Sequence, residues 1–399
     1  MTRKQLIILL VLVVALGGAA LLHFREQSAS WSSAANTAMG KKLLGDGFQV
    51  NDVAQIQIRR GTNELDLSNT NGRWRVRQRA DYPAAFSQIS SLLLKLQGLK
   101  IVQTLQVAPS QRPELDLAAG QGTNAATVVE LCDAGGRPLR ALWLGKNHVA
   151  QGAQASPEGE PEAWPDGRYV LTGSNSTTVA VISDPLSELN TQPNSWLDKT
   201  FFKIAKPRSI AVEYPKATNS WQLVRSSETG AWKLADAKPD EKLDASQASE
   251  VADALSSPSF NDVAVGLTPA QTGLDDPTRV EIKTFDGFDY AMNVGRQTND
   301  NDYFTVRVSG GFPQKRTPGE DEKPEQTKAL DAAFQANLNK LRDQLARESA
   351  FSNWVYLVPN WTLDPLLKKR SQLLVAKPAT PETNAVPARA VSAAAASKK

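Results

Sequence analysis

Few side chains in this chain of 399 residues are of the types that carry histidine, thiol or zinc chemistry. The chain has two histidines, His23 and His148, and one cysteine, Cys132. These residues cannot supply a histidine- or cysteine-rich zinc site, and a single cysteine cannot form an intrachain disulfide. No nucleophile motif accompanies His148, so we expect a solvated loop histidine at a strand end. Cys132 ends the apolar run 127–132, which predicts a buried strand thiol.

Two glycine-containing segments resemble phosphate-binding loops, but neither has the required surroundings. Residues 120–125 read GQGTNA and lead into a predicted strand, whereas a dinucleotide-binding loop leads into a helix. Gly145-Lys146 lacks the upstream glycine and the following serine or threonine of a P-loop. We therefore expect neither a nucleotide site nor a cofactor.

Carboxylates are the remaining residues that could serve an enzyme. Asp275-Asp276 and the pair formed by Asp300 and Asp302 could act in acid–base chemistry or bind calcium. Residues 299–303 lack the glycine and the terminal glutamate of an EF-hand loop, and asparagine and aspartate side chains stabilise turns. We therefore predict turns at both places, and no residue is predicted to be catalytic, cofactor-binding or metal-binding.

The residues that do recur belong to structural elements, and they recur in the same order in the two halves of the chain. Matching motifs lie about 150–180 residues apart, which indicates one duplicated module altered by loop insertions. The first half has Ile56-Gln57-Ile58, Trp74-Arg75-Val76, Leu115-Asp116, Leu144-Gly145-Lys146 and Asp184-Pro185-Leu186. The second half has Ile210-Ala211-Val212, Trp232-Lys233-Leu234, Leu274-Asp275, Val294-Gly295-Arg296 and Asp364-Pro365-Leu366.

Hydrophobic periodicity predicts several short strands and one helix in each half. Alternating segments such as 53–58 are typical of half-buried strands. Apolar residues spaced by three and four predict helices over 84–99 and 245–255. The predicted fold class is α+β, with two related modules of mostly antiparallel sheet and packed helices. We place these modules at residues 48–206 and 207–375 and expect one transmembrane helix before them.

The second half has a helix that the first half lacks. A charged loop at 313–327 precedes a predicted helix inserted at 328–348. Its apolar stripe favours packing on its own domain, and a partner-binding face is the alternative. The predicted partner surface comprises Leu330, Phe334, Leu338, Leu341, Leu345, Trp354 and Trp361.

The nine tryptophans raise the alternative of a carbohydrate-binding protein, because indole rings stack on sugars. Trp74 and Trp232 occupy matching strand positions and are therefore predicted to lie in the two cores. Trp164, Trp354 and Trp361 lie outside the repeated pattern and are the better candidates for an exposed surface.

The N-terminus indicates a membrane protein. Residues 5–24 contain no charged side chain and, as a helix, would span about 30 Å, the thickness of a bilayer core. Arg3 and Lys4 precede this segment, which favours a cytoplasmic N-terminus, with the bulk of the chain in the periplasm. We therefore predict a transmembrane anchor at 1–25 and a stalk at 26–47. A signal peptide cleaved after the small residues Gly17 and Ala19 is the alternative.

The remaining composition indicates a globular protein that does not bind nucleic acid. The net charge is +3, and positive and negative side chains are interleaved, so the sequence has no basic stripe of the kind that follows a phosphate backbone. Residues 376–399 are rich in alanine and proline and are predicted to form a disordered tail.

The order of motifs resembles a bacterial family of domains of unknown function, over about residues 48–375. The resemblance rests on the tryptophan strand, the apolar helix, the turn Gly273-Leu274-Asp275-Asp276-Pro277 and the hairpin ending in Val294-Gly295-Arg296. It implies a membrane-anchored extracytoplasmic protein associated with auxiliary subunits of gliding-motility-type ABC transporters, present here as two copies. We therefore expect a non-enzymatic accessory or scaffold protein of the inner membrane that contacts envelope or transporter subunits. A carboxylate-dependent glycan-active enzyme and a glycan-binding protein are the alternatives.

Overall fold

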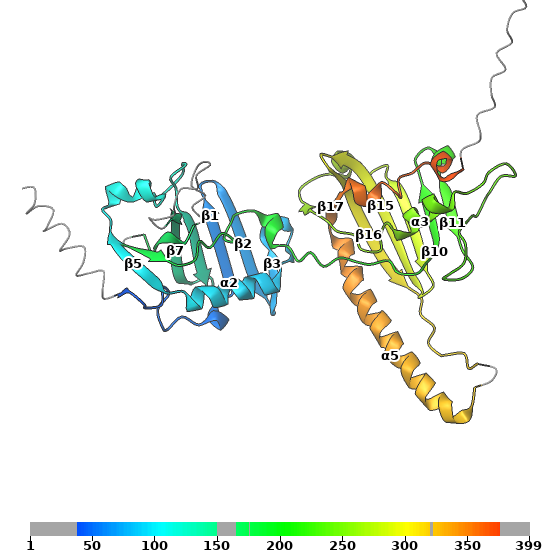
Figure 1. Cartoon of the computed structure of the whole chain (residues 1–399), viewed down its shortest axis with the longest axis horizontal. Coiled ribbons are helices and arrows are strands. Elements are labelled where there is room, and N and C mark those ends of the chain that lie inside the picture. The colour runs from blue at the N-terminus through cyan, green and yellow to red at the C-terminus, as the bar shows by residue number, and fades with distance from the viewer. Residues whose placement is uncertain (1–37, 150–164, 175, 320–321, 376–399) are drawn as a thin grey trace, which may run out of the picture.

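Two antiparallel sheets make up the body of the protein (Figure 1). The computed structural model describes residues 38–149, 165–174, 176–319 and 322–375. Within these ranges one sheet has nine strands and the other has eight. Helices pack on both sheets, which confirms the predicted α+β class.

The first sheet has the order β4-β3-β2-β1-β6-β7-β8-β9-β5. Its strands are β1 (Gln55–Arg60), β2 (Asn63–Thr70), β3 (Arg73–Val76), β4 (Tyr82–Pro83), β5 (Ile101–Gln106), β6 (Thr127–Cys132), β7 (Pro138–His148), β8 (Gly167–Leu171) and β9 (Thr178–Ile182). The helical elements are η1 (Val50–Asp52), η2 (Arg77–Arg79), α2 (Phe86–Gly98), η3 (Pro109–Leu115) and η4 (Pro193–Trp196).

Helix α2 covers one face of this sheet (Figure 1) because its apolar residues repeat with helical spacing. Ile89, Leu92, Leu93 and Leu96 are buried. Phe86, which the periodicity placed in the same stripe, is instead 64% exposed, since it lies in the first turn, at the end of the helix.

The second sheet has the order β12-β11-β10-β14-β15-β16-β17-β13. Its strands are β10 (Pro207–Glu213), β11 (Trp221–Val224), β12 (Lys233–Leu234), β13 (Asp262–Ala264), β14 (Thr278–Thr284), β15 (Phe288–Thr298), β16 (Asn301–Gly310) and β17 (Val355–Pro359). The helical elements are η5 (Ala217–Asn219), α3 (Ala245–Asp253), α4 (Pro269–Thr272), α5 (Pro324–Glu348), η6 (Ser349–Asn353), α6 (Asn360–Leu363) and η7 (Arg370–Leu373).

The two sheets follow the same path through the chain. From β3 onward the first sheet reads β3-β2-β1-β6-β7-β8-β9-β5, and each strand has its counterpart at the same place in the second sheet. In both, the strand that follows the helix α2 or α3 lies at the far edge, as β5 or β13. Helix α5 lies between β16 and β17, where the first sheet has only the short connection from β8 to β9.

A close contact between a strand glycine and a helical turn occurs in both sheets. A Cβ on Gly145 of β7 would lie 2.3 Å from the carbonyl oxygen of Leu115, and a Cβ on Gly295 of β15 would lie 2.3 Å from that of Thr272. After each carbonyl comes a residue with positive φ: Asp116 at 53° and Gly273 at 72°.

This geometry corrects one of the motif matches between the halves. A leucine follows the positive-φ residue in each sheet's turn, and Leu117 and Leu274 both lie against the glycine. The backbone N–H groups of both leucines also donate five residues back, to Arg112 and Pro269. Leu117, and not Leu115, is therefore the counterpart of Leu274.

An ion pair joins one edge of the first sheet to one edge of the second. Arg79 in η2 donates from Nε to Oδ1 of Asp262 in β13 at 2.6 Å and from Nη2 to Oδ2 at 2.7 Å. This two-pronged geometry fixes orientation as well as distance. Lys199, in the connection between the sheets, donates to the carbonyl oxygen of Asn261 at 2.6 Å.

Aromatic rings fill the space beside this ion pair. The ring of Tyr82 in β4 lies 4.8 Å from that of Trp354, 5.6 Å from that of Phe260 and 6.1 Å from that of Tyr356, measured between centroids. Burial raises the pKa of the Tyr82 hydroxyl. Most of the buried apolar residues of the two sheets consequently form one continuous cluster, and a second, smaller cluster in the first half includes Leu117 and Leu171.

The predicted stalk does not extend through residue 47. Leu43 and Leu44 are buried, and the backbone N–H of Leu43 donates to the carbonyl oxygen of Leu99 at 2.8 Å. Two adjacent leucines are costly to leave in water, so residues 38–47 pack against the first sheet. The predicted anchor at 5–24, the rest of the stalk and the predicted tail at 376–399 lie outside the described residues. Among the residues that are described, no helix is long and apolar enough to cross a membrane.

Candidate partner-binding surface

Helix α5 carries most of the predicted partner surface, and the two halves of the helix have different surroundings. In the C-terminal half, Leu338 is buried, and Leu341 and Leu345 pack on the core. Glu348, at the end of the helix, is buried and accepts a 2.7 Å hydrogen bond from the hydroxyl of Tyr290. This half of the stripe holds the helix on its own domain.

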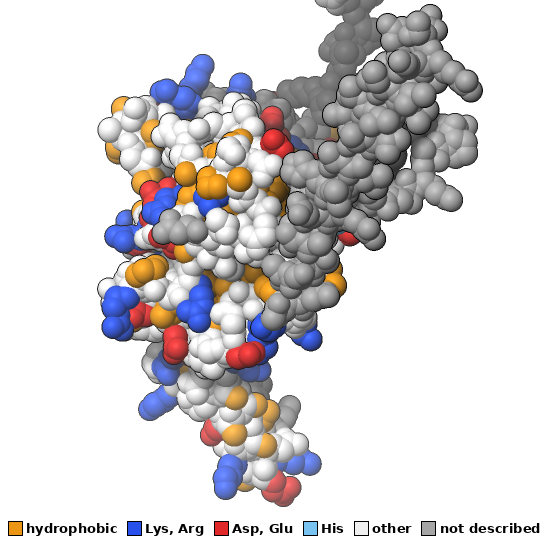
Figure 2. All heavy atoms as spheres, turned by 90° about the vertical axis from the view of Figure 1, so that its left-hand side faces the viewer, with side chains coloured by type: hydrophobic (Ala, Val, Ile, Leu, Met, Phe, Trp, Pro, Cys, Tyr) orange, Lys and Arg blue, Asp and Glu red, His pale blue; other side chains and the backbone are white. Residues whose placement is uncertain are grey.

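The N-terminal half of α5 projects away from the second sheet (Figure 1). Leu330 is 43% exposed, and Phe334 is half-buried. Four alanines in this half are exposed: Ala329, Ala332, Ala333 and Ala336. Figure 2 shows apolar side chains interleaved with both signs of charge along the part of the protein that extends below the body.

The loop before α5 holds the projecting half in place. Arg316 pairs with Glu322 and with Asp331, whose Oδ1 lies 3.0 Å from the arginine Nε. The arginine lowers the pKa of Glu322 to about 2. Nearer the body, Arg342 donates to the side chain of Gln314 at 2.6 Å. A hollow of about 290 Å³, lined by residues that include Phe334, separates the loop from the helix.

The two tryptophans of the predicted surface are not part of α5, and their surroundings differ. Trp354 is half-buried between the sheets, where its indole N–H donates to the carbonyl oxygen of Ala80 at 3.1 Å. It therefore belongs to the contact between the sheets, which corrects the prediction of an exposed surface. Trp361 on α6 is 69% exposed, the largest exposed fraction among the large apolar side chains that the structure describes. Trp164 lies outside the described residues.

Of the two core tryptophans, Trp74 is buried as predicted. Trp232 is only half-buried, and the guanidinium carbon of Arg225 lies 4.6 Å from its ring centroid. Its ring face is thus covered by a cation as well as by the core.

Cys132 and His148 differ in how well the sequence predicted them. Cys132 is buried in β6, as predicted, and burial raises the pKa of its thiol. His148 lies within β7, and its Nδ1 lies 2.7 Å from Oδ1 of Asp166. The ring of Tyr169 contacts the imidazole edge to face at 5.4 Å. His148 is thus at a strand end, as predicted, but its side chain is only 26% exposed because Asp166, just before β8, and Tyr169, within β8, contact the ring.

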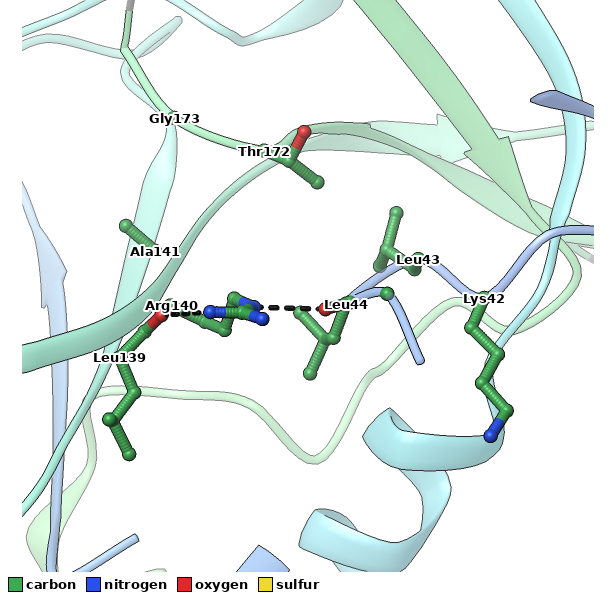
Figure 3. A pocket seen from close by; sticks show the side chains of 9 residues that line it. Lys42, Leu43, Leu44, Leu139, Arg140, Ala141, Thr172 and Gly173 are labelled. Atoms are coloured by element: carbon green, nitrogen blue, oxygen red, sulfur yellow. Dashed lines mark hydrogen bonds between the residues drawn. The ribbon is translucent and has the colours of Figure 1, made fainter. Parts of the chain in front are cut away.

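A hollow between the N-terminal described residues and the first sheet measures about 390 Å³ (Figure 3). Arg140 points into it from β7 and donates to the carbonyl oxygens of Leu44 and Leu139 at 2.9 Å and 2.6 Å. Because the guanidinium already binds backbone oxygens, Arg140 serves to hold the segment at 42–45 in place.

The carboxylates singled out by the sequence lie in contrasting surroundings. Asp275 and Asp276 are exposed in a turn, as predicted, and Asp300 is exposed in the turn between β15 and β16. Asp302 is different, because it lies within β16 and is only 6% exposed. Burial, and secondarily the charge of Asp364, raise the pKa of its carboxyl to about 6. The prediction that Asp302 lies in a turn was therefore wrong.

Some buried polar atoms are unpaired on the helix that packs against β16. Five buried side-chain nitrogen or oxygen atoms of the described residues have no hydrogen-bond partner. Two of them, Oδ1 of Asn360 and Oγ1 of Thr362, belong to the short helix α6 that follows β17. Sequence reasoning did not single out either residue, since neither stands in a recognisable motif.

Comparison with known families gives one result. A model described as Domain of unknown function (DUF4340) matches residues 74–277. The match begins in β3 of the first sheet and ends just before β14 of the second, so it includes Arg79, Tyr82 and Asp262 of the contact between the sheets. No curated protein and no solved structure matches the chain.

Proposed function

The chain belongs to the family of domains of unknown function DUF4340, and we propose that it is a non-enzymatic accessory or scaffold protein of an envelope or ABC-type transport assembly. In this proposal, residues 5–24 anchor the chain in the bacterial inner membrane with the N-terminus cytoplasmic. The two sheets are two copies of one duplicated module and lie in the periplasm. Their common strand order and the repeated contacts of Gly145 and Gly295 support the duplication.

The observation that carries the proposal is the projecting half of α5. A helix that leaves its own domain and exposes Leu330 beside four alanines is a suitable ligand for an apolar groove on another protein. The ion pairs of Arg316 fix the helix in advance, which lowers the conformational entropy lost on binding. The partner expected from this chemistry is a membrane-associated protein with an apolar groove rimmed by polar groups.

The glycan-active alternative has two supporting observations and one against it. Asp302, with a pKa raised to about 6, together with Asp364 resembles an acid–base carboxylate pair, and Trp361 is exposed nearby in sequence. However, Asp302 is only 6% exposed, so a sugar ring cannot reach its carboxyl in this conformation. The exposed helix is therefore the stronger basis for a function.

The test is affinity capture of the full chain from detergent-solubilised membranes. We expect the wild-type chain to recover a specific membrane partner and the double variant Leu330→Glu/Ala333→Glu to lose most of it, about tenfold or more, because charges cannot enter an apolar groove without a large desolvation cost. Leu94→Glu is the matched control, since Leu94 is a 60% exposed leucine on α2. Equal recovery by the α5 variant and the control would refute a role for α5, and the absence of any partner with the wild-type chain would refute the scaffold function.

A further inference from the structure

Asp302 lies at a buried strand position of the kind that apolar side chains usually occupy. Along β16 it is on the same face as Phe304, Val306 and Val308, all of which are buried, and it pairs with the buried Val358 of β17. A carboxylate placed in such a row loses its hydration, which is costly unless a hydrogen bond or an opposite charge replaces it.

The surrounding protein supplies no such replacement. Among the described residues, no hydrogen bond and no ion pair reaches the Asp302 carboxylate, and the charge that acts on it is another carboxylate, Asp364. Asp364 itself is exposed, and its charge acts on the buried Asp302 carboxylate. Without a lysine or arginine beside them, two such carboxylates destabilise the folded chain unless Asp302 takes up a proton or a cation that does not belong to the chain lies between them.

Helix α6 carries a further unpaired side-chain oxygen, one turn before Asp364. Asn360 and Asp364 are four residues apart, and the N–H of Asp364 donates to the carbonyl oxygen of Asn360 at 2.8 Å, so the two side chains lie on one face of the helix. The N–H of Asn360 donates to the carbonyl oxygen of Asp300 at 3.0 Å, which ties this helix to the start of β16. The buried Oδ1 of Asn360 is one of the unpaired atoms.

We propose that Asp302, Asp364 and Oδ1 of Asn360 bind a divalent cation, Ca²⁺, with backbone carbonyl oxygens and water completing its coordination. All three side chains offer oxygen, which hard cations prefer, and the two carboxylates balance a double positive charge. Ca²⁺ accepts irregular sets of six to eight oxygens, whereas Mg²⁺ requires a nearly ideal octahedron, so the irregular mixture of strand and helix ligands favours Ca²⁺.

The ligand set also limits the affinity. No group of three or more histidine, cysteine or acidic residues is suitably placed within the described part of the chain. With only two carboxylates, the dissociation constant should be on the order of 10⁻⁴–10⁻³ M, the range of extracellular calcium modules. Binding would join α6 to the start of β16 and fix the exposed Trp361 next to the ion.

The experiment is calorimetric titration of the full chain in detergent with CaCl₂ at pH 7.5, after treatment with a chelator. We expect Asp302→Asn and Asp364→Asn each to weaken binding about tenfold or more, because each removes one of two charged ligands. Asp300→Asn is the matched control: it removes the same charge two residues away, from an exposed side chain, and should bind like the wild type. Urea unfolding of each variant confirms that it is folded.

A second readout uses Tb³⁺ in place of Ca²⁺. Excitation of tryptophan should produce Tb³⁺ luminescence that Ca²⁺ suppresses, and Trp361→Phe should lose this luminescence while its calorimetric binding of Ca²⁺ persists. Absence of Ca²⁺ binding by the wild-type chain at concentrations up to about 10 mM, well above the expected dissociation constant, would overturn the proposal. Equal binding by wild type and Asp302→Asn would overturn it as well, since the ion would then be bound elsewhere.

Discussion

Replacing either strand glycine by alanine should destabilise the protein by a similar amount. The added Cβ would lie 2.3 Å from a backbone carbonyl oxygen, that of Leu115 for Gly145→Ala and that of Thr272 for Gly295→Ala, whereas real Cβ contacts are essentially never shorter than 3.0 Å. The turn must therefore move by most of an ångström, and the oxygen cannot swing away like a flexible side chain.

The magnitude follows from the cost of overpacking. Inserting one methyl group into a well-packed site costs about 1–3 kcal/mol, and we expect the upper part of this range because the neighbour is backbone. Both sites also contact a leucine, with Cγ of Leu117 at 2.9 Å and Cδ2 of Leu274 at 3.2 Å from the added carbon. A loss of about 2–3 kcal/mol corresponds to a decrease in Tm of roughly 5–10 °C for domains of this size.

Urea unfolding followed by tryptophan fluorescence measures the change. Gly47→Ala and Gly311→Ala are the matched controls near the first and the second sheet, because nothing lies within 4 Å of a Cβ at either glycine and neither has the positive φ that L residues avoid. These controls should change the free energy of unfolding by less than about 1 kcal/mol. If Gly145→Ala and Gly295→Ala were as stable as their controls, the structural equivalence of the two turns would lose its physical basis.

Two further predictions concern charged groups. Arg79→Ala should destabilise the chain by about 2 kcal/mol, because it leaves the largely buried Asp262 without its partner. In urea unfolding, the exchanged variant Arg79→Asp/Asp262→Arg should restore part of this loss. A neutral effect of Arg79→Ala would show that the pair contributes nothing to stability. The pKa of Asp302 is raised from 3.8 to about 6, so between these pH values the folded chain binds a proton that the unfolded chain does not. With a chelator present, the free energy of unfolding should therefore decrease by up to about 3 kcal/mol as the pH rises through this window. Asp302→Asn should lack this part of the pH dependence, and an identical pH profile for the wild type and this variant would contradict the assignment of the raised pKa to Asp302.

Periodicity and turn residues predicted much of the fold, because they report which face of an element is buried. The helices at 86–98 and 245–253 and the α+β class followed from apolar spacing. The match between Leu115 and Leu274 failed for a physical reason: the left-handed turn is made by Asp116 in the first half of the chain and by Gly273 in the second, and no sequence pattern shows that these two residues share a conformation.

The candidate site was less predictable, since it depends on which neighbours cover each side chain. An aspartate in a polar segment is usually solvated, and only the pairing of Asp302 with Val358 and the packing of α6 show that it is buried. The apolar stripe of α5 likewise does not reveal that Leu338 packs against its own domain while Leu330 is exposed. Trp354 was assigned to a free surface because the contact between the sheets joins residues separated by 274 positions.

The edge-to-edge contact has a mechanical consequence. The described chain begins at the far end of the first sheet, and α5 projects from the second (Figure 1). The bidentate pair of Arg79 and Asp262 joins the two sheets. Because this contact fixes an angle as well as a separation, it limits the movement of one sheet relative to the other. With the proposed anchor in the bilayer, the two sheets would act as a spacer that sets the distance between the membrane and the partner-binding helix α5.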